Sequence, residues 1–199
     1  MVVDVGANDG GYGEFLRQGG YTGKILSFEP LAVAHAALSS RATPDRGWSV
    51  AARCALGDTP GMLNIHVAGN STSSSLLPML QRHVDAAPQS APVATEPVPV
   101  YRLDDIDHPQ LKSAKRVLLK IDTQGYEMPV LRGASKTLER CAGLQVEMSI
   151  VPLYAGQALY RELIDYLDGV GFDLWGLLPG FVDPSSGRLL QMDGLFFRR

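Results

Sequence analysis

Glycines and acidic side chains follow several apolar segments of this chain, and both residue types can build a ligand site. The apolar run Val2–Val5 is followed by Gly6 and Gly10. Glycine has no Cβ, so its backbone can adopt positive φ angles and a ligand can come into van der Waals contact with it. A second apolar run, about 20 residues further on, ends at Glu29, whose carboxylate can accept two hydrogen bonds from a vicinal diol. Together these residues predict a site for a ribose-containing ligand.

The spacing of the glycines narrows the class of ligand. Gly6, Gly10, Gly11 and Gly13 fit neither the dinucleotide fingerprint G-x-G-x-x-G nor the phosphate-binding loop G-x-x-x-x-G-K-[ST]. This disfavours an NAD-linked dehydrogenase and favours a ligand with a ribose but no phosphate, such as S-adenosylmethionine. In the alternative interpretation, the glycines only shape a tight turn between strand and helix, and Glu29 caps the helix that follows.

A third apolar run, Val117–Ile121, leads into Asp122, and Gly125 and Glu127 follow closely. Carboxyl ends of parallel strands meet at one edge of a sheet, so we expect Asp122 near the glycine turn. An aspartate there can take a proton from a substrate hydroxyl, hold a divalent metal, or cap the next helix. We take Asp122 as the first candidate for a general base. Glu127 is expected to interact with the helix dipole or to position the substrate.

Two further side chains are candidates for chemistry. His66 lies in the alternating segment 62–67, which is typical of a hairpin strand. Histidine exchanges a proton readily near neutral pH, so His66 is the second candidate base. The alternative for His66 is an exposed position on the hairpin. Glu147, near the end of an apolar run over 144–148, either contacts the substrate or has a structural role.

Strands and helices alternate along most of the chain, a pattern that predicts an α/β fold of parallel βαβ units. Strands are expected over 24–29, 48–56, 62–67, 98–103, 117–121 and 144–148, and helices over 11–19, 31–41, 126–140 and 159–170. A final pair, 172–178 with 190–197, predicts a hairpin whose last strand is antiparallel. Residues 69–97 are rich in serine and proline, and we expect them to form a mobile loop or lid.

Composition limits the function further. The chain has 199 residues, which favours one domain over 1–199. With a net charge of −3 and no basic stripe, nucleic-acid binding has little electrostatic support. Cys54 and Cys141 stand alone in apolar surroundings, and no membrane span or signal peptide is predicted, so we expect a cytoplasmic protein. Met1 stands directly before the first strand, so either the coding sequence starts here or an upstream helix is missing.

Several of these segments occur in an order that resembles one known family. They are Val3-Asp4-Val5-Gly6-Ala7-Asn8-x-Gly10, Phe28-Glu29-Pro30, Ala55-Leu56-Gly57-Asp58, Arg102-Leu103-Asp104-Asp105, Leu119-Lys120-Ile121-Asp122-Thr123-Gln124-Gly125-Tyr126-Glu127, Val130-Leu131-Arg132-Gly133-Ala134, Val146-Glu147 and Met192-Asp193-Gly194-Leu195-Phe196. This series resembles the motifs of the FkbM-type S-adenosylmethionine-dependent methyltransferases. The resemblance implies a Rossmann-like, seven-stranded methyltransferase sheet, mostly parallel with an antiparallel last strand and with helices on both faces.

The resemblance also implies roles for individual residues. The methionine end of S-adenosylmethionine is expected against Asp4, Gly6, Asn8 and Gly10, its ribose at Glu29, its adenine near Asp58, and its methyl group near Asp122. Gln124 and Glu127 are expected to contact the substrate. Many relatives carry Glu where this chain has Gln124, so a metal ligand is not carried over to this position, and we expect no metal.

The function that follows is methylation of a hydroxyl group on a sugar, a glycoside or a secondary metabolite. An aliphatic hydroxyl is a poor nucleophile, so a base should assist it. The alternative is a non-catalytic cofactor-binding or scaffold domain on the same fold, because fold alone does not fix function. A cavity for a methyl acceptor would separate the two hypotheses. A homo-oligomer is also compatible with the sequence, through pairing of an exposed hairpin over 62–67.

Overall fold

The computed structural model describes residues 1–199 and contains a seven-stranded sheet with the strand order β3-β2-β1-β7-β8-β10-β9. Its strands are β1 (Val2–Val5), β2 (Ile25–Phe28), β3 (Trp48–Val50), β7 (Val117–Ile121), β8 (Cys141–Ser149), β9 (Phe172–Pro179) and β10 (Gln191–Arg198). The first five strands pair in parallel, whereas β10 lies between β8 and β9 and is antiparallel to both. The predicted α/β fold and its antiparallel last strand are thus confirmed.

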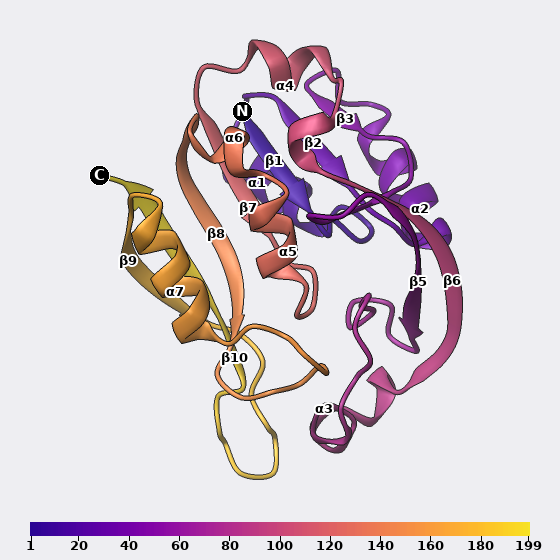
Figure 1. Ribbon diagram of the computed structural model, residues 1–199. Coiled ribbons are helices and arrows are strands. Elements are labelled where there is room, and N and C mark those ends of the chain that lie inside the picture. Colours follow the sequence, from indigo (N-terminus) through magenta and orange to yellow (C-terminus); the bar gives the residue numbers. More distant parts are fainter.

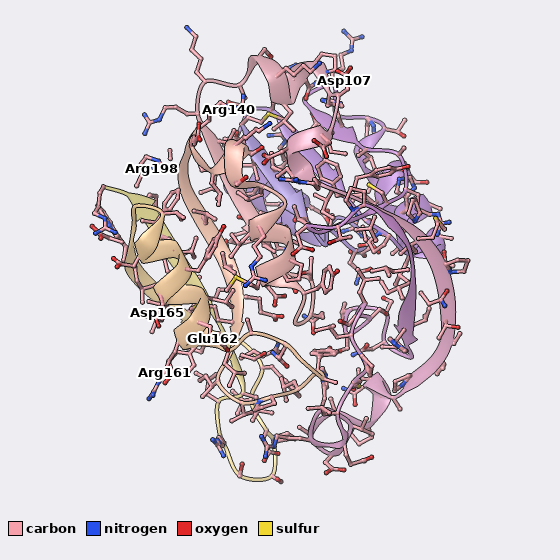
Figure 2. The ribbon with its side chains drawn as sticks, viewed as in Figure 1. Asp107, Arg140, Arg161, Glu162, Asp165 and Arg198 are labelled. Atoms are coloured by element: carbon pink, nitrogen blue, oxygen red, sulfur yellow. The ribbon has the colours of Figure 1, made fainter.

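Helices cover both faces of this sheet. The helices of the chain are α1 (Gly11–Gln18), α2 (Ala32–Ala42), α3 (Gln81–Ala86), α4 (Pro109–Ser113), α5 (Glu127–Arg132), α6 (Ser135–Leu138) and α7 (Tyr160–Gly169), with short 3₁₀ turns at Pro88–Ser90 and Leu103–Asp105. Side chains alternate along β1: Val3 and Val5 join the core beneath α5 and α7, while Val2 packs with residues of α2 on the other face. Charged residues of α7, including Arg161 and Asp165, project outward from the sheet (Figure 2).

A second, three-stranded sheet extends from the first. It has the order β4-β6-β5 and consists of β4 (Ala55–Leu56), β5 (Gly61–Ala68) and β6 (Pro92–Tyr101). The long β5–β6 pair curves away from the main sheet, and α3 lies near its far end (Figure 1). No helix of the chain is long and apolar enough to cross a lipid bilayer.

The structure differs from the sequence-based expectations in three places. The strand expected over 48–56 is two strands in different sheets, since β3 pairs with β2 and β4 pairs with β6. The helix expected over 126–140 divides into α5 and α6 at Gly133, where a Cβ would stand only 2.0 Å from the carbonyl oxygen of Gly57. Finally, the segment expected as a loop over 69–97 contains α3, a 3₁₀ turn and the first half of β6.

Candidate functional site

The carboxyl ends of β1, β2 and β7 surround a cavity with about 700 Å³ of empty space, named cavity A here. One part of its wall is apolar and comes mainly from β4 and its surroundings: Phe28, Cys54, Ala55, Leu56, Ile65 and Leu76. The rest is polar and includes Gly6, Asn8 and Glu29 from the turns after β1 and β2. A hollow that combines an apolar wall with a few convergent polar groups is typical of small-molecule sites.

Gly6 occupies a position that only glycine fits. Its φ angle is +76°, and a Cβ placed on it would stand 1.8 Å from the backbone oxygen of Asp122. Asn8 also has a positive φ of 47°, so the chain turns sharply here. The turn brings the backbone N–H of Asn8 toward β2, where it donates a 2.8 Å hydrogen bond to Glu29 Oε2. The backbone of the β1 turn therefore forms part of the wall of cavity A.

Glu29 is buried and held in place by backbone groups on two sides. Its Oε1 atom accepts a 2.8 Å hydrogen bond from the N–H of Leu31, in addition to the Asn8 bond on Oε2. Burial raises the pKa of Glu29 to about 7, although these two hydrogen bonds act in the opposite direction. Each carboxylate oxygen keeps a further lone pair, so the side chain can still accept hydrogen bonds from a diol in cavity A. Glu29 thus holds the backbone just before α2 and lines cavity A, and its contact with a ribose stays a prediction.

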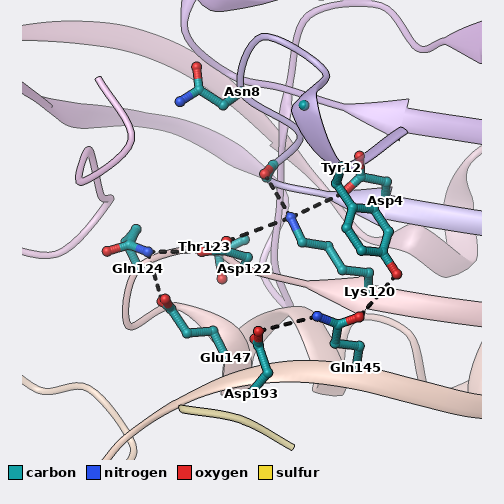
Figure 3. Close-up of polar contacts among 12 residues, drawn as sticks. Asp4, Asn8, Tyr12, Lys120, Asp122, Thr123, Gln124, Gln145, Glu147 and Asp193 are labelled. Carbon is teal, nitrogen blue, oxygen red and sulfur yellow. Dashed lines mark hydrogen bonds and ion pairs between the residues drawn. The ribbon is translucent and has the colours of Figure 1, made fainter. Parts of the chain in front are cut away.

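Below the glycine turn, the ammonium group of Lys120 connects β1 with β7. Its Nζ atom is 3.1 Å from Asp4 Oδ1, 3.7 Å from Asp122 Oδ2 and 3.2 Å from the carbonyl oxygen of Gly6, to which it donates (Figure 3). Burial by itself lowers the pKa of Lys120, but the carboxylates of Asp4 and Asp122 outweigh it and raise the pKa. Tyr12 covers the ammonium with its ring, 5.3 Å away. Lys120 is therefore a charged cross-link beneath the site.

A second cavity, cavity B, lies beside the first and has about 670 Å³ of empty space. Its wall is mostly polar and includes Asn70, His83, Gln89, Glu147, Phe181 and Gln191. Thr72, Asp122 and Gln124 belong to the walls of both cavities. The two cavities therefore meet just beyond the end of β7.

At this junction the side-chain amide of Gln124 bridges two carboxylates. Its Nε2 atom donates to Asp122 Oδ1 at 2.8 Å and to Glu147 Oε2 at 2.7 Å (Figure 3). Glu147 Oε2 also accepts a 2.8 Å hydrogen bond from Gln191 Nε2. Burial, and then the neighbouring carboxylate of Asp122, raise the pKa of Glu147 well above its ordinary value. Asp122 and Glu147 are thus positioned by one amide at the meeting point of the cavities.

Other predicted site residues lie outside both cavities. Asp4 is buried against Lys120 beneath the turn. A Cβ on Gly10 would contact Leu38 and Trp48 instead of open space. His66 and Asp58 line neither cavity. Ala55 and Leu56, which precede Asp58 in the chain, do line cavity A.

Glu127 stabilises its own turn and lines neither cavity. Its Oε1 atom accepts hydrogen bonds of 3.0 Å from the N–H groups of Thr123 and Gly125 and of 3.1 Å from the Thr123 hydroxyl. Burial raises its pKa to about 7. Because Thr123 and Gly125 lie before α5, Glu127 stabilises the turn between β7 and α5, and its expected contact with the substrate stays a prediction.

The sequence interpretation assigned no role to Lys120 or His83, although both are part of this region. A lysine in the otherwise apolar run of β7 is a recognisable signal, because a buried lysine needs a charged partner. His83 gave no such signal, because its segment was expected to be a loop. Only the folded chain places His83 in the wall of cavity B.

The residues around cavity A fit S-adenosylmethionine on chemical grounds. The apolar wall at Ala55 and Leu56 suits a flat base, and Glu29 suits the ribose hydroxyls. Because Gly6 has no side chain, its backbone is open to contact with the amino-acid end of S-adenosylmethionine. The acidic junction at Asp122 suits the positive sulfonium.

Comparison with known proteins agrees with this geometry. Residues 4–174 match the Methyltransferase FkbM domain. The chain matches no curated protein.

Solved structures show the same fold at low sequence identity. A putative S-adenosylmethionine-dependent methyltransferase from Listeria monocytogenes has a TM-score of 0.54 at 9% identity, covering 100% of this chain and 90% of that one. A putative tRNA (m1A22) methyltransferase from Streptococcus pneumoniae has a TM-score of 0.53 at 9% identity, with coverages of 100% and 63%. A SAM-dependent methyltransferase from Aquifex aeolicus has a TM-score of 0.50 at 11% identity, covering 100% of this chain and 81% of that one. The domain match and the site together show that this chain belongs to the FkbM family of S-adenosylmethionine-dependent methyltransferases.

Proposed function

We propose that this methyltransferase acts on oxygen and methylates a hydroxyl group of a sugar, a glycoside or a secondary metabolite. The observation that carries the proposal is the meeting of two cavities at Asp122 and Gln124. Cavity A suits the cofactor and cavity B suits a polar acceptor. A scaffold domain has no need for a second cavity at this place, so cavity B counts against the non-catalytic alternative.

S-adenosylmethionine supplies an electrophilic methyl group when it is bound. Among the residues of the chain, Glu29 accepts hydrogen bonds from the ribose. We assign Asp122 as the base that takes the proton from the acceptor hydroxyl, because its carboxylate is partly exposed at the junction. Glu147, with its raised pKa, holds a proton more readily and can donate a hydrogen bond to the acceptor.

Gln124 is assigned as a positioning residue for this pair of acids. Its two N–H groups are both used, one by each carboxylate. Its Oε1 atom lies 2.8 Å from the hydroxyl of Tyr154. The amide is thus fixed at both ends, which keeps Asp122 facing the junction.

The composition of cavity B also bears on the type of acceptor. No lysine or arginine lines it. The chain has a net charge of −3. These properties disfavour a nucleic-acid acceptor such as the tRNA named for the Streptococcus protein.

Cys54 and Cys141 are both buried and unpaired, which supports the cytoplasm as the place of action.

Two measurements test the proposal. Calorimetric titration with S-adenosylmethionine should give a saturable heat, whereas a folded protein that gives no heat would exclude the cofactor role of cavity A. A screen of sugars, glycosides and hydroxylated metabolites with methyl-labelled cofactor should then yield a labelled ether. Label recovered only on nitrogen or carbon would contradict O-methylation.

The role of Asp122 is tested by Asp122→Asn. A positioned base contributes about 100- to 10,000-fold, so turnover should fall by that factor while the dissociation constant of the cofactor changes less than about threefold. The amide keeps an oxygen that can accept the hydrogen bond from Gln124, so the site should stay assembled. Unchanged turnover would remove Asp122 from the mechanism.

A further inference from the structure

One wall of cavity B contains a buried histidine that has no role in the function proposed above. His83 lies on α3 and is only 2% exposed. Its Nδ1 atom is buried and has no hydrogen-bond partner in the protein. By contrast, His35 of α2 places its Nε2 atom 2.8 Å from the carbonyl oxygen of Ala51. The imidazole of His83 therefore has unused hydrogen-bonding capacity, and the residue belongs to the wall of cavity B.

An unpartnered buried nitrogen of this kind is costly. Leaving a buried polar atom unsatisfied costs about 1–3 kcal/mol, and native proteins seldom keep one without a reason. Burial also lowers the pKa of His83 to about 4, so the imidazole is neutral at physiological pH. A neutral imidazole has one donor and one acceptor nitrogen, which matches the two roles of a hydroxyl group.

Tyr154 connects the ring of His83 with Gln124, the residue that positions the acids. The imidazole packs edge-on against Tyr154, with ring centroids 5.2 Å apart, and lies 5.2 Å from the ring of Phe181. The Tyr154 hydroxyl lies 2.8 Å from Gln124 Oε1, and Gln124 in turn bridges Asp122 and Glu147. The imidazole and the junction acids are thus joined through one set of packed side chains around cavity B.

We propose that His83 is a specificity-determining residue that binds a second hydroxyl of the methyl acceptor, so that the acceptor is an uncharged polyol with at least two hydroxyl groups. This rests on the proposed function, because Asp122 must bind the hydroxyl that is methylated. Two carboxylates and no lysine or arginine line cavity B, so phosphorylated or carboxylated acceptors are disfavoured. Phe181 adds an apolar surface for the C–H face of such a polyol.

The first test needs no acceptor. His83→Phe removes the unpartnered nitrogen and keeps a ring between Tyr154 and Phe181, so its melting temperature should equal or exceed that of the parent protein. His35→Phe is the matched control and should lower the melting temperature, because it removes a satisfied hydrogen bond. His83→Leu repeats the test without a ring. A fall of 5 °C or more in both His83 variants would show that the imidazole serves stability and would overturn the proposal.

The second test uses defined probes: methyl glycosides of common hexoses and deoxyhexoses, inositol, and the phosphate esters of each. With ¹⁵N-histidine labelling and saturating S-adenosylmethionine, a neutral polyol should shift the ring signals of His83 and leave those of His35 unchanged. The phosphate esters should bind at least tenfold more weakly. Binding of the esters alone, or of no polyol, would overturn the polyol assignment. Absence of cofactor binding would instead contradict the proposed function itself.

The third test separates contact from mere packing. For a polyol that is methylated, His83→Phe should raise KM at least tenfold, while kcat and the cofactor dissociation constant stay within about threefold. One monodeoxy analogue lacks a hydroxyl other than the methylated one. With the parent enzyme its KM should exceed that of the full polyol by the same factor, and with His83→Phe its KM should rise no further. If removal of each hydroxyl raises KM by the same factor in the parent enzyme and in His83→Phe, His83 does not contact the acceptor.

Discussion

Replacing Lys120 by Met gives the sharpest test of how the site is held together. The Lys120 ammonium lies 3.1 Å from Asp4 Oδ1, and Asp4 is fully buried at 0% exposure. Methionine has a similar length but no charge, so the variant leaves the Asp4 carboxylate buried without its cation. Breaking a buried ion pair in this way costs about 3–5 kcal/mol. For a chain of this length, the melting temperature should fall by about 6–20 °C.

The same substitution should also weaken cofactor binding. Lys120 donates to the Gly6 carbonyl oxygen at 3.2 Å and so fixes the backbone that lines cavity A. Loss of this hydrogen bond frees the Gly6 backbone, so the dissociation constant should rise, by no more than the roughly 10- to 150-fold that corresponds to the about 1.5–3 kcal/mol of a hydrogen bond from a charged donor. Urea unfolding and calorimetric titration measure the two effects separately.

Two further variants make this prediction refutable. In the double variant Asp4→Asn with Lys120→Met, the fully buried carboxylate is gone and only the partly exposed Asp122 lacks its cation, so more than half of the lost stability should return. Lys115→Met is the control, because Lys115 is exposed and its substitution should change stability by less than about 0.5 kcal/mol. A loss below about 1 kcal/mol for Lys120→Met, or a double variant no more stable than the single one, would refute the cross-link.

Two more predictions concern cavity A. Gly6→Ala should abolish cofactor binding or folding, because its Cβ would stand 1.8 Å from the backbone oxygen of Asp122. Calorimetry and circular dichroism measure these two effects. Gly20 is the control: it has a similar φ of +84° with nothing within 4 Å of an added Cβ, so Gly20→Ala should lower the unfolding free energy by only about 1–2 kcal/mol. The raised pKa of Glu29, about 7, means that its stabilising contribution is complete below about pH 4.5 and is lost as the pH rises through 7. The unfolding free energy of the parent protein relative to Glu29→Gln should therefore decrease over this interval in urea titrations, and a difference that is independent of pH would contradict the raised pKa.

The sequence by itself determined the parts of the site that depend on local pattern. Short apolar runs followed by Gly6, Glu29 and Asp122 indicate strands that end at one edge of a parallel sheet, and the structure brings Gly6, Glu29 and Asp122 into the wall of cavity A. Residue order and spacing are sufficient here, because the geometry of a parallel βαβ unit is nearly fixed. The antiparallel insertion of β10 was predictable for a similar reason, from the last pair of apolar runs.

Prolines misled the prediction for β6. Pro92 and Pro97 indicated a loop, yet both lie inside this strand. The reason is that β4 pairs only with Val100 and Tyr101, so the preceding residues of β6 have one free edge. A missing N–H group costs nothing at such an edge. Whether an edge is free depends on strands far apart in the sequence, which local pattern does not reveal.

Only the tertiary structure decided which polar groups meet. Lys120 receives its partner Asp4 from a strand 116 positions earlier in the chain. His83 and Glu147 line the same cavity B although they lie on elements far apart in the sequence. Periodicity specifies which face of an element is buried, but it carries no information on which buried charges become neighbours. Because the energy of a buried charge depends on its partners within a few ångströms, the chemistry of this site was settled by folding.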